Sequence, residues 1–180
     1  MSSLSAPSPF DPPPHFSLIH PHLYRTSTFT SLHLPFLRPL QLRTVLSLGP
    51  ELPSRALQSY FDNEEGKGVR FVHLGAGRGR EMGDWRPVRE ELIKEALEFV
   101  LEKRNMPCLV MDQSGIHETG ILVGCLRKLE RWTLSAVLAE YASLAGSRTR
   151  GSNEQFIELF DTDLVVIPQG RGGSNGLWTL

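Results

Sequence analysis

The stretch Cys108-Leu-Val-Met-Asp-Gln-Ser-Gly-Ile-His-Glu-Thr-Gly120 decides the fold of this chain. Its apolar start predicts a short strand, and the residues from Thr119 onward have the spacing of an amphipathic helix. A turn that contains Gly115 joins the two. A strand that passes through such a turn into a helix aims backbone N–H groups at a bound anion, so the stretch predicts a phosphate cradle.

Strand-like and helix-like runs alternate around this stretch. The β-rich runs lie at 16–20, 23–26, 43–49, 70–75 and 108–112, and the helical patterns at about 28–40, 54–63, 87–103, 119–131, 134–145 and 153–161. This alternation predicts an α/β domain with a central sheet of about five strands flanked by helices.

The composition fits one domain between two tails. A chain of 180 residues with 40% hydrophobic content can bury a sizeable core. We expect a disordered Pro/Ser-rich tail at 1–15, the domain at 16–168 and a flexible Gly-rich tail at 169–180.

The net charge and the cysteine content indicate which classes of partner and which cellular compartment to expect. A formal net charge of −1 gives no global field for nucleic acid or an anionic membrane, so neither is expected as a partner. Cys108 and Cys125 lie in apolar runs, which is typical of buried free thiols in a reducing compartment. With no run of ~18 apolar residues to span a membrane, the sequence predicts a cytoplasmic protein.

Four further segments carry a family resemblance that runs from about Phe16 to Asp161. They are Phe16-Ser-Leu-Ile followed by Leu23-Tyr-Arg-Thr, Leu42-Arg-Thr-Val-Leu-Ser-Leu-Gly-Pro-Glu51, Gly120-Ile-Leu-Val-Gly-Cys-Leu-Arg-Lys-Leu-Glu-Arg-Trp132 and Glu154-Gln-Phe-Ile-Glu-Leu-Phe-Asp161. With them the chain resembles the plant and fungal atypical dual-specificity phosphatases, the tyrosine-phosphatase-like group that contains the fungal oxidant-induced cell-cycle arrest proteins. The resemblance implies a cysteine-phosphatase-like fold.

The loop itself departs from the pattern of that family, which is His-Cys, five residues, then Arg-Thr-Gly, often with a Lys inside. The chain keeps the family residue at Gly115, His117, Thr119 and Gly120 and replaces it at Met111 (for His), Asp112 (for Cys), Ile116 (for Lys) and Glu118 (for Arg). The resemblance therefore implies a degenerate loop, which comprises Asp112, Gln113, Ser114, Gly115, Ile116, His117 and Glu118. No catalytic residue is expected in it.

Two arguments support that expectation. A cysteine phosphatase needs a thiolate nucleophile, and Asp112 as an alternative nucleophile has Ser114 where an aspartyl-phosphate enzyme of the haloacid dehalogenase type has its second Asp. Glu118 would repel a phosphoryl group, at ~4 kcal/mol for unit charges ~4 Å apart in an effective dielectric of ~20. We expect both carboxylates to serve instead as internal ligands of the helix N-terminus. We expect no metal and no cofactor.

A second glycine-rich loop, from Gly75 to Trp85, aligns with the family loop that carries the general acid. Glu81 and Asp84 are its vestigial general-acid candidates, and Arg78 and Arg80 are candidate ligand-binding residues for a phosphorylated molecule.

The sequence thus favours a catalytically inactive phosphatase-fold protein, a pseudophosphatase. It would act as a scaffold or regulatory subunit whose partners are proteins, related phosphatase-fold proteins among them, as the resemblance implies. Two alternatives stay open: a protein-tyrosine or inositol-pyrophosphate phosphatase with unrecognised chemistry, and a non-catalytic sensor of a phosphorylated ligand.

Overall fold

A computed structural model describes residues 11–62, 68–77 and 83–168 of the chain. Residues 1–10 and 169–180, which make up most of the two predicted tails, lie outside the described residues. Within the described ranges, no helix is both long and apolar enough to span a membrane.

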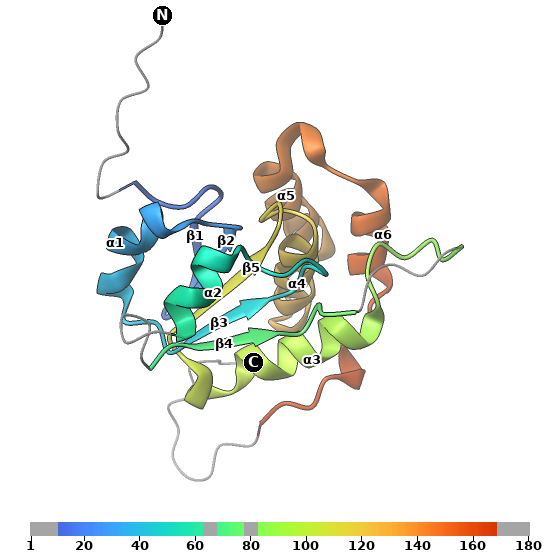
Figure 1. The fold of residues 1–180 in the computed structure, drawn as a ribbon. Helices are drawn as coiled ribbons and strands as arrows, with labels where there is room; N and C mark the ends of the chain where they lie inside the picture. The colour runs from blue at the N-terminus through green and yellow to red at the C-terminus, as the bar shows by residue number, and fades with distance from the viewer. Residues whose placement is uncertain (1–10, 63–67, 78–82, 169–180) are drawn as a thin grey trace, which may run out of the picture.

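The described residues build one five-stranded sheet, in the order β1-β2-β5-β3-β4 (Figure 1). The strands are β1 (Ser17–His20), β2 (Leu23–Ser27), β3 (Thr44–Ser47), β4 (Arg70–His73) and β5 (Cys108–Asp112). β1 pairs antiparallel with β2, and the remaining neighbours are parallel. The sheet confirms the predicted α/β class, and each strand begins and ends within a few residues of its predicted position.

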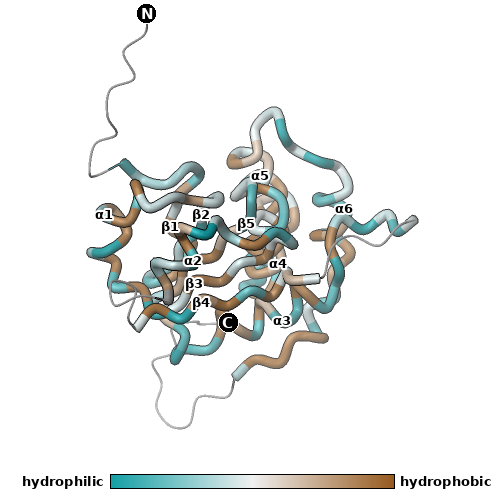
Figure 2. Tube along the Cα trace, in the orientation of Figure 1, coloured by the Kyte–Doolittle hydropathy of each residue, from teal (hydrophilic) through white to brown (hydrophobic). Residues whose placement is uncertain are grey.

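Helices cover both faces of the sheet (Figure 1). They are α1 (Leu34–Leu37), α2 (Arg55–Asp62), α3 (Glu90–Leu101), α4 (Glu118–Leu129), α5 (Leu134–Ala145) and α6 (Gly151–Leu159). The larger core cluster joins α3 to α6 with one face of the sheet, and a smaller cluster joins α1 and α2 with the other. Figure 2 shows apolar residues along β3 and β4 in the middle of the molecule, as a two-layered core requires.

The prediction of one continuous helix over 28–40 is wrong. The chain instead forms η1 (Ser31–His33), the single turn α1 and η2 (Arg38–Leu40) in succession. Pro35 and Pro39 each stand in the first turn of a new piece, because proline lacks the N–H that would continue the preceding helix. Gln41 ends the run in the left-handed conformation, with φ 48°.

The central position of β5 places the loop that follows it. All five residues of the strand are buried, and it ends at Asp112 with neighbours on both sides. α4 begins six residues later at Glu118. The intervening turn passes close to β2, because a Cβ built on Gly115 would lie 2.6 Å from the backbone nitrogen of Ser27. With φ +69° as well, only glycine fits there without strain.

Candidate active site

The carboxylate of Asp112 occupies the cradle that the loop forms. Its Oδ1 accepts hydrogen bonds from the backbone N–H of Ser114 (2.6 Å) and of Gly115, and from the Ser114 hydroxyl (2.8 Å). Its Oδ2 accepts from the backbone N–H of Thr119 (2.7 Å), in the first turn of α4. Asp112 is only 1% exposed. The side chain therefore acts as the internal anion that the sequence predicts, held by N–H donors that suit phosphoryl oxygens.

Ser114 and Arg25 hold the loop in this shape. The Ser114 hydroxyl accepts from the backbone N–H groups of Ile116 (3.0 Å) and His117 (3.1 Å). Arg25 on β2 is buried and donates from Nη2 to the carbonyl oxygen of Gly115 (2.7 Å). Burial lowers the pKa of Arg25, and the nearby Asp112 carboxylate opposes that shift. The loop is thus anchored to the sheet as well as to α4.

Glu118 stands in a different environment from Asp112. Burial raises the pKa of its carboxyl group to about 7, and the negative charges of Asp112 and Glu51 act in the same direction. A hydrogen bond from its own backbone N–H and the charge of Arg150 oppose the shift. Glu118 therefore exchanges a proton near neutral pH and does not carry the fixed negative charge that the sequence suggests.

His117 is linked to α6 by a chain of hydrogen bonds. Asn153 Nδ2 donates to His117 Nδ1 (3.3 Å) and to the Tyr141 hydroxyl (2.9 Å), and Asn153 is fully buried. Burial lowers the pKa of His117, and the positive charges of Arg150 and Arg148 contribute. His117 is therefore a neutral hydrogen-bonding group within the loop at neutral pH.

Arg148 and Arg150 are site residues that sequence reasoning missed. Both are exposed, and both charges act on His117, while Arg150 also acts on Glu118. They belong to the connection between α5 and α6, far from the loop in sequence. The packing of both α5 and α6 against α4, including the close fit of Ile157 on Gly124, brings that connection to the cradle.

Neither cysteine can replace the missing thiolate. Cys108 lies at the opposite end of β5 from the loop, and burial raises its pKa to about 12. Cys125 is buried inside α4, and burial raises its pKa further still. Both are buried free thiols, as predicted, and burial disfavours the thiolate form that a nucleophilic cysteine needs.

The remaining predicted residues divide between the described and the undescribed chain. Arg78, Arg80 and Glu81 lie outside the described residues. Asp84 lies in a turn, where its Oδ1 accepts from the backbone N–H of Arg86 (3.0 Å). In the loop, Gln113 is exposed and Ile116 is buried in the core. Among the described residues, no group of three or more His, Cys, Asp or Glu side chains is arranged to hold a metal ion.

Three comparisons place these features among known proteins. Residues 11–174 match the model of the tyrosine phosphatase family. The chain is 41% identical to the probable tyrosine-protein phosphatase DG1060 of Dictyostelium discoideum, over 86% of this chain and 90% of that protein. It is 37% identical to the inositol diphosphatase DSP1 of rice (Oryza sativa), over 83% of this chain and 65% of that protein. The crystal structure of the core catalytic domain of the PP-IP phosphatase SIW14 from S. cerevisiae superposes with a TM-score of 0.75 at 32% identity, covering 85% and 89% of the two chains.

These relatives correct the function expected from the sequence. The prediction of a catalytically inactive scaffold, a pseudophosphatase, is wrong, because the similar proteins are named as tyrosine-protein phosphatases and inositol diphosphatases. The prediction rested on the missing thiolate and on Glu118 as a permanent negative charge, and the second of these arguments is weakened because burial raises the pKa of Glu118 to about 7. The alternative of a phosphatase with unrecognised chemistry agrees better with the comparisons.

Proposed function

We propose, from the premise that this chain belongs to the tyrosine phosphatase family, that it is a phosphatase for inositol diphosphates or phosphotyrosine. One observation carries the proposal: three backbone N–H groups of the loop between β5 and α4, those of Ser114, Gly115 and Thr119, converge on a single anion position. The names of the relatives supply the two substrate classes.

The nucleophile in this proposal is Asp112. When a phosphoryl group enters, its oxygens take over the N–H groups of Ser114, Gly115 and Thr119, which now bind the Asp112 carboxylate. A released carboxylate oxygen attacks phosphorus, a P–O bond forms, and the bond to the leaving oxygen breaks. Water then attacks the acyl phosphate, which frees inorganic phosphate and restores the carboxylate.

Glu118 supplies the proton transfers. With a pKa of about 7, a large share of this carboxyl group is neutral at neutral pH, so it can protonate the leaving oxygen in the first step. As a carboxylate it then accepts a proton from the attacking water. The neutral form also removes much of the repulsion that a fixed charge at this position would exert on the substrate. The positive charges of Arg148 and Arg150 act on the same region and favour a polyanionic substrate.

Release of inorganic phosphate tests the proposal directly. The purified protein is incubated with an inositol diphosphate and with a phosphotyrosine peptide, with Asp112→Asn and Gln113→Ala assayed in parallel. Gln113 is an exposed neighbour in the same loop, so its substitution controls for general disturbance of the loop. We expect phosphate release by the parent and by Gln113→Ala, and none by Asp112→Asn, with hydroxylamine trapping an acyl phosphate on the parent.

Two results would overturn the proposal. The first is no release of phosphate from either substrate by a parent protein whose cooperative thermal melt shows that it is folded. The second is equal release by the parent and Asp112→Asn, which would remove Asp112 from the chemistry.

A further inference from the structure

His15 holds a fixed position although its side chain is exposed. The carbonyl oxygen of Pro14, directly before it, accepts hydrogen bonds from the Ser27 N–H (2.9 Å), the Ser27 hydroxyl (3.0 Å) and the Thr26 hydroxyl (3.1 Å). The ring of Phe16, directly after it, packs against aromatic rings of β2 and α1. These contacts hold His15 in the left-handed conformation, with φ 57°. Such a conformation persists where the surroundings enforce it, and it is often found at functional sites.

The segment anchored in this way lies beside the cradle. A Cβ built on Gly115 would lie 2.6 Å from the backbone nitrogen of Ser27, so the residue that anchors the segment also contacts the loop. The hydroxyl of Thr28, the next residue, donates to the carbonyl oxygen of Asp112 (3.5 Å). The end of β2 therefore joins the segment of His15 to the loop that surrounds the Asp112 carboxylate.

The imidazole of His15 meets Arg148 from the connection between α5 and α6. Arg148 Nη2 lies 2.8 Å from His15 Nε2. Because a guanidinium can only donate, Nε2 is the acceptor, and the ring is neutral with its proton on Nδ1. Partial burial lowers the pKa of His15, and the positive charges of Arg148 and Arg25 act in the same direction. The Asp112 carboxylate opposes them. The neutral ring that this contact needs is therefore the form present at neutral pH.

The backbone beside Arg148 is fixed to α4. The backbone N–H of Arg150 donates to the Tyr141 hydroxyl (3.3 Å). The Tyr141 ring packs closely on Gly120, where a Cβ would lie 3.0 Å from it. An exposed arginine side chain on such a backbone still has many rotamers, and holding it in one of them costs entropy. The bond to His15 restricts the Arg148 side chain in advance, so a ligand has less of that entropy to remove.

We propose that His15 is a positioning residue, which directs the Arg148 guanidinium to the mouth of the cradle so that it binds a phosphate group of an inositol diphosphate that lies outside the cradle. A guanidinium binds phosphate oxygens through two parallel N–H bonds, so its orientation matters as well as its charge. A phosphotyrosine side chain has no second phosphate, and the pair therefore favours the inositol substrate. This role rests on the proposed phosphatase function and names the pair of residues that sets its substrate preference.

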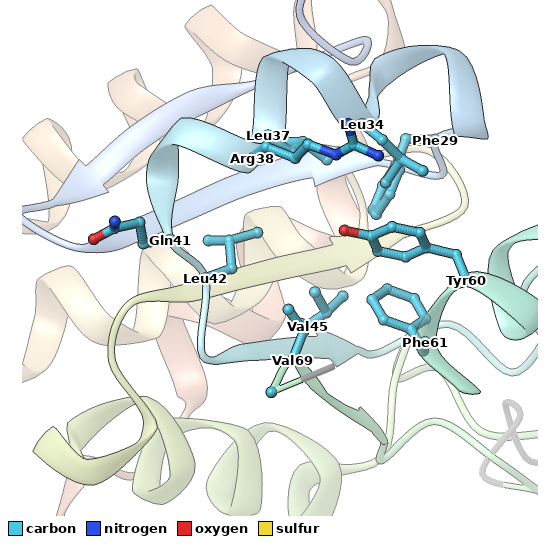
Figure 3. Close-up of a pocket in the computed structure, with 11 residues that line it drawn as sticks. Phe29, Leu34, Leu37, Arg38, Gln41, Leu42, Val45, Tyr60, Phe61 and Val69 are labelled. Carbon is cyan, nitrogen blue, oxygen red and sulfur yellow. The ribbon is translucent and has the colours of Figure 1, made fainter. Parts of the chain in front are cut away.

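The cavity shown in Figure 3 is a different kind of site. Its volume is about 370 Å³, and most of its lining is apolar, including Phe29, Leu34, Leu37, Val45 and Phe61. Burying phosphate groups against such a lining is costly, so we expect inositol phosphates at the cradle. Val69 also lines this cavity and is half-buried, so Val69→Phe is a control for binding there.

Steady-state kinetics of matched variants test the positioning role on the full chain. His15→Asn suits the left-handed backbone, but its side chain ends near the position of Nδ1 and is too short to reach Arg148. His15→Gln places an amide near the position of Nε2 and keeps an acceptor there. We expect KM for an inositol diphosphate to rise about 3- to 10-fold in His15→Asn and about tenfold in Arg148→Gln, with little change in kcat. His15→Gln should stay within about twofold of the parent.

Further controls separate this role from a general effect on the loop. KM for p-nitrophenyl phosphate, which has no second phosphate, should change by less than about twofold in every variant. His15→Asn should add nothing in an Arg148→Gln background, because it acts through that arginine. Arg131→Gln, at an exposed arginine in the turn after α4, and Val69→Phe should leave both KM values unchanged.

A binding measurement distinguishes failure of this role from failure of the proposed function. Inositol hexakisphosphate is titrated into the parent and the variants by isothermal titration calorimetry, which needs no turnover. The dissociation constants should follow the same order as the KM values, also in a parent that releases no phosphate. The positioning role is overturned if the parent does not bind, if His15→Asn binds as tightly as the parent, or if His15→Gln binds as weakly as His15→Asn.

Discussion

Replacement of Asp112 by Asn tests whether this side chain is the anion that completes the loop. The substitution keeps the size of the side chain and removes its charge. Oδ2 accepts a hydrogen bond from the Thr119 N–H at 2.7 Å in the parent. In the variant an NH₂ group takes this position, so two hydrogen-bond donors face each other. The variant loses one charge-assisted hydrogen bond of about 1.5–3 kcal/mol and leaves a buried N–H unpaired, a loss that relief of the repulsion with Glu118 partly offsets.

The expected loss in the free energy of unfolding is about 2–4 kcal/mol. For a chain of this size it corresponds to a drop of about 5–15 °C in melting temperature. Differential scanning calorimetry of Asp112→Asn beside Gln113→Ala measures it, since the exposed Gln113 should change stability by no more than about 0.5 kcal/mol.

A second measurement separates an anion site from ordinary packing. Asp112→Ala vacates the position that the donors surround, so inorganic phosphate at ten times its dissociation constant should restore about 1.4 kcal/mol. The parent should gain less at the same phosphate concentration, because phosphate must first displace its own carboxylate from the position. The reasoning fails if Asp112→Asn has the same melting temperature as Gln113→Ala, or if phosphate stabilises the parent and Asp112→Ala equally.

Three further predictions concern the same region. The raised pKa of Glu118 means that the folded chain binds a proton more tightly at this group than the unfolded chain does. Stability should therefore fall as pH rises from 4.5 to about 7 and stay low above it. Melting temperatures of Glu118→Gln across this range should fall less than those of the parent, because the variant has no carboxyl group to titrate at this position. Gly115→Ala should destabilise the chain by at least about 2 kcal/mol more than Gly77→Ala in urea titrations. The two glycines have similar φ angles, +69° and +66°, so the backbone strain is matched, but only a Cβ on Gly115 would meet backbone atoms, at 2.6 Å. Arg25→Gln should lower stability by about 2–4 kcal/mol in the same titrations, because it removes a buried charged donor to Gly115; an unchanged midpoint would show that β2 does not anchor the loop.

Local sequence features predicted much of the framework. The strand 108–112 is correct to the residue, because a short apolar run bounded by Pro107 and a glycine turn has few other solutions. The internal role of Asp112 was also predictable, since the strand–turn–helix pattern forms an anion cradle and the free N–H groups of a helix N-terminus favour a negative side chain. The helix over 28–40 failed because apolar spacing was weighed above Pro35 and Pro39.

Tertiary contacts decided what the sequence could not predict. The pKa of Glu118 depends first on burial, then on the charge of Asp112 in the same loop, and also on Glu51 from another loop. The burial and the Glu51 charge cannot be inferred from the spacing within 108–120. Arg148 and Arg150 reach the site through the packing of α5 and α6 on α4. The error about function is related, because Glu118 was interpreted from its residue type without the burial that raises its pKa to about 7.

The strand order has a consequence for synthesis on the ribosome. β1 and β2 form one unit and β3 and β4 another, and the two units share no strand pairing until β5 inserts between β2 and β3. A nascent chain that ends before Cys108 therefore exposes the inner edges of β2 and β3, which are open to pairing with other chains. The step that closes these edges also delivers Asp112 to the end of β5. A chain that ends before this point would hold two separate strand pairs with open inner edges and would lack the loop between β5 and α4.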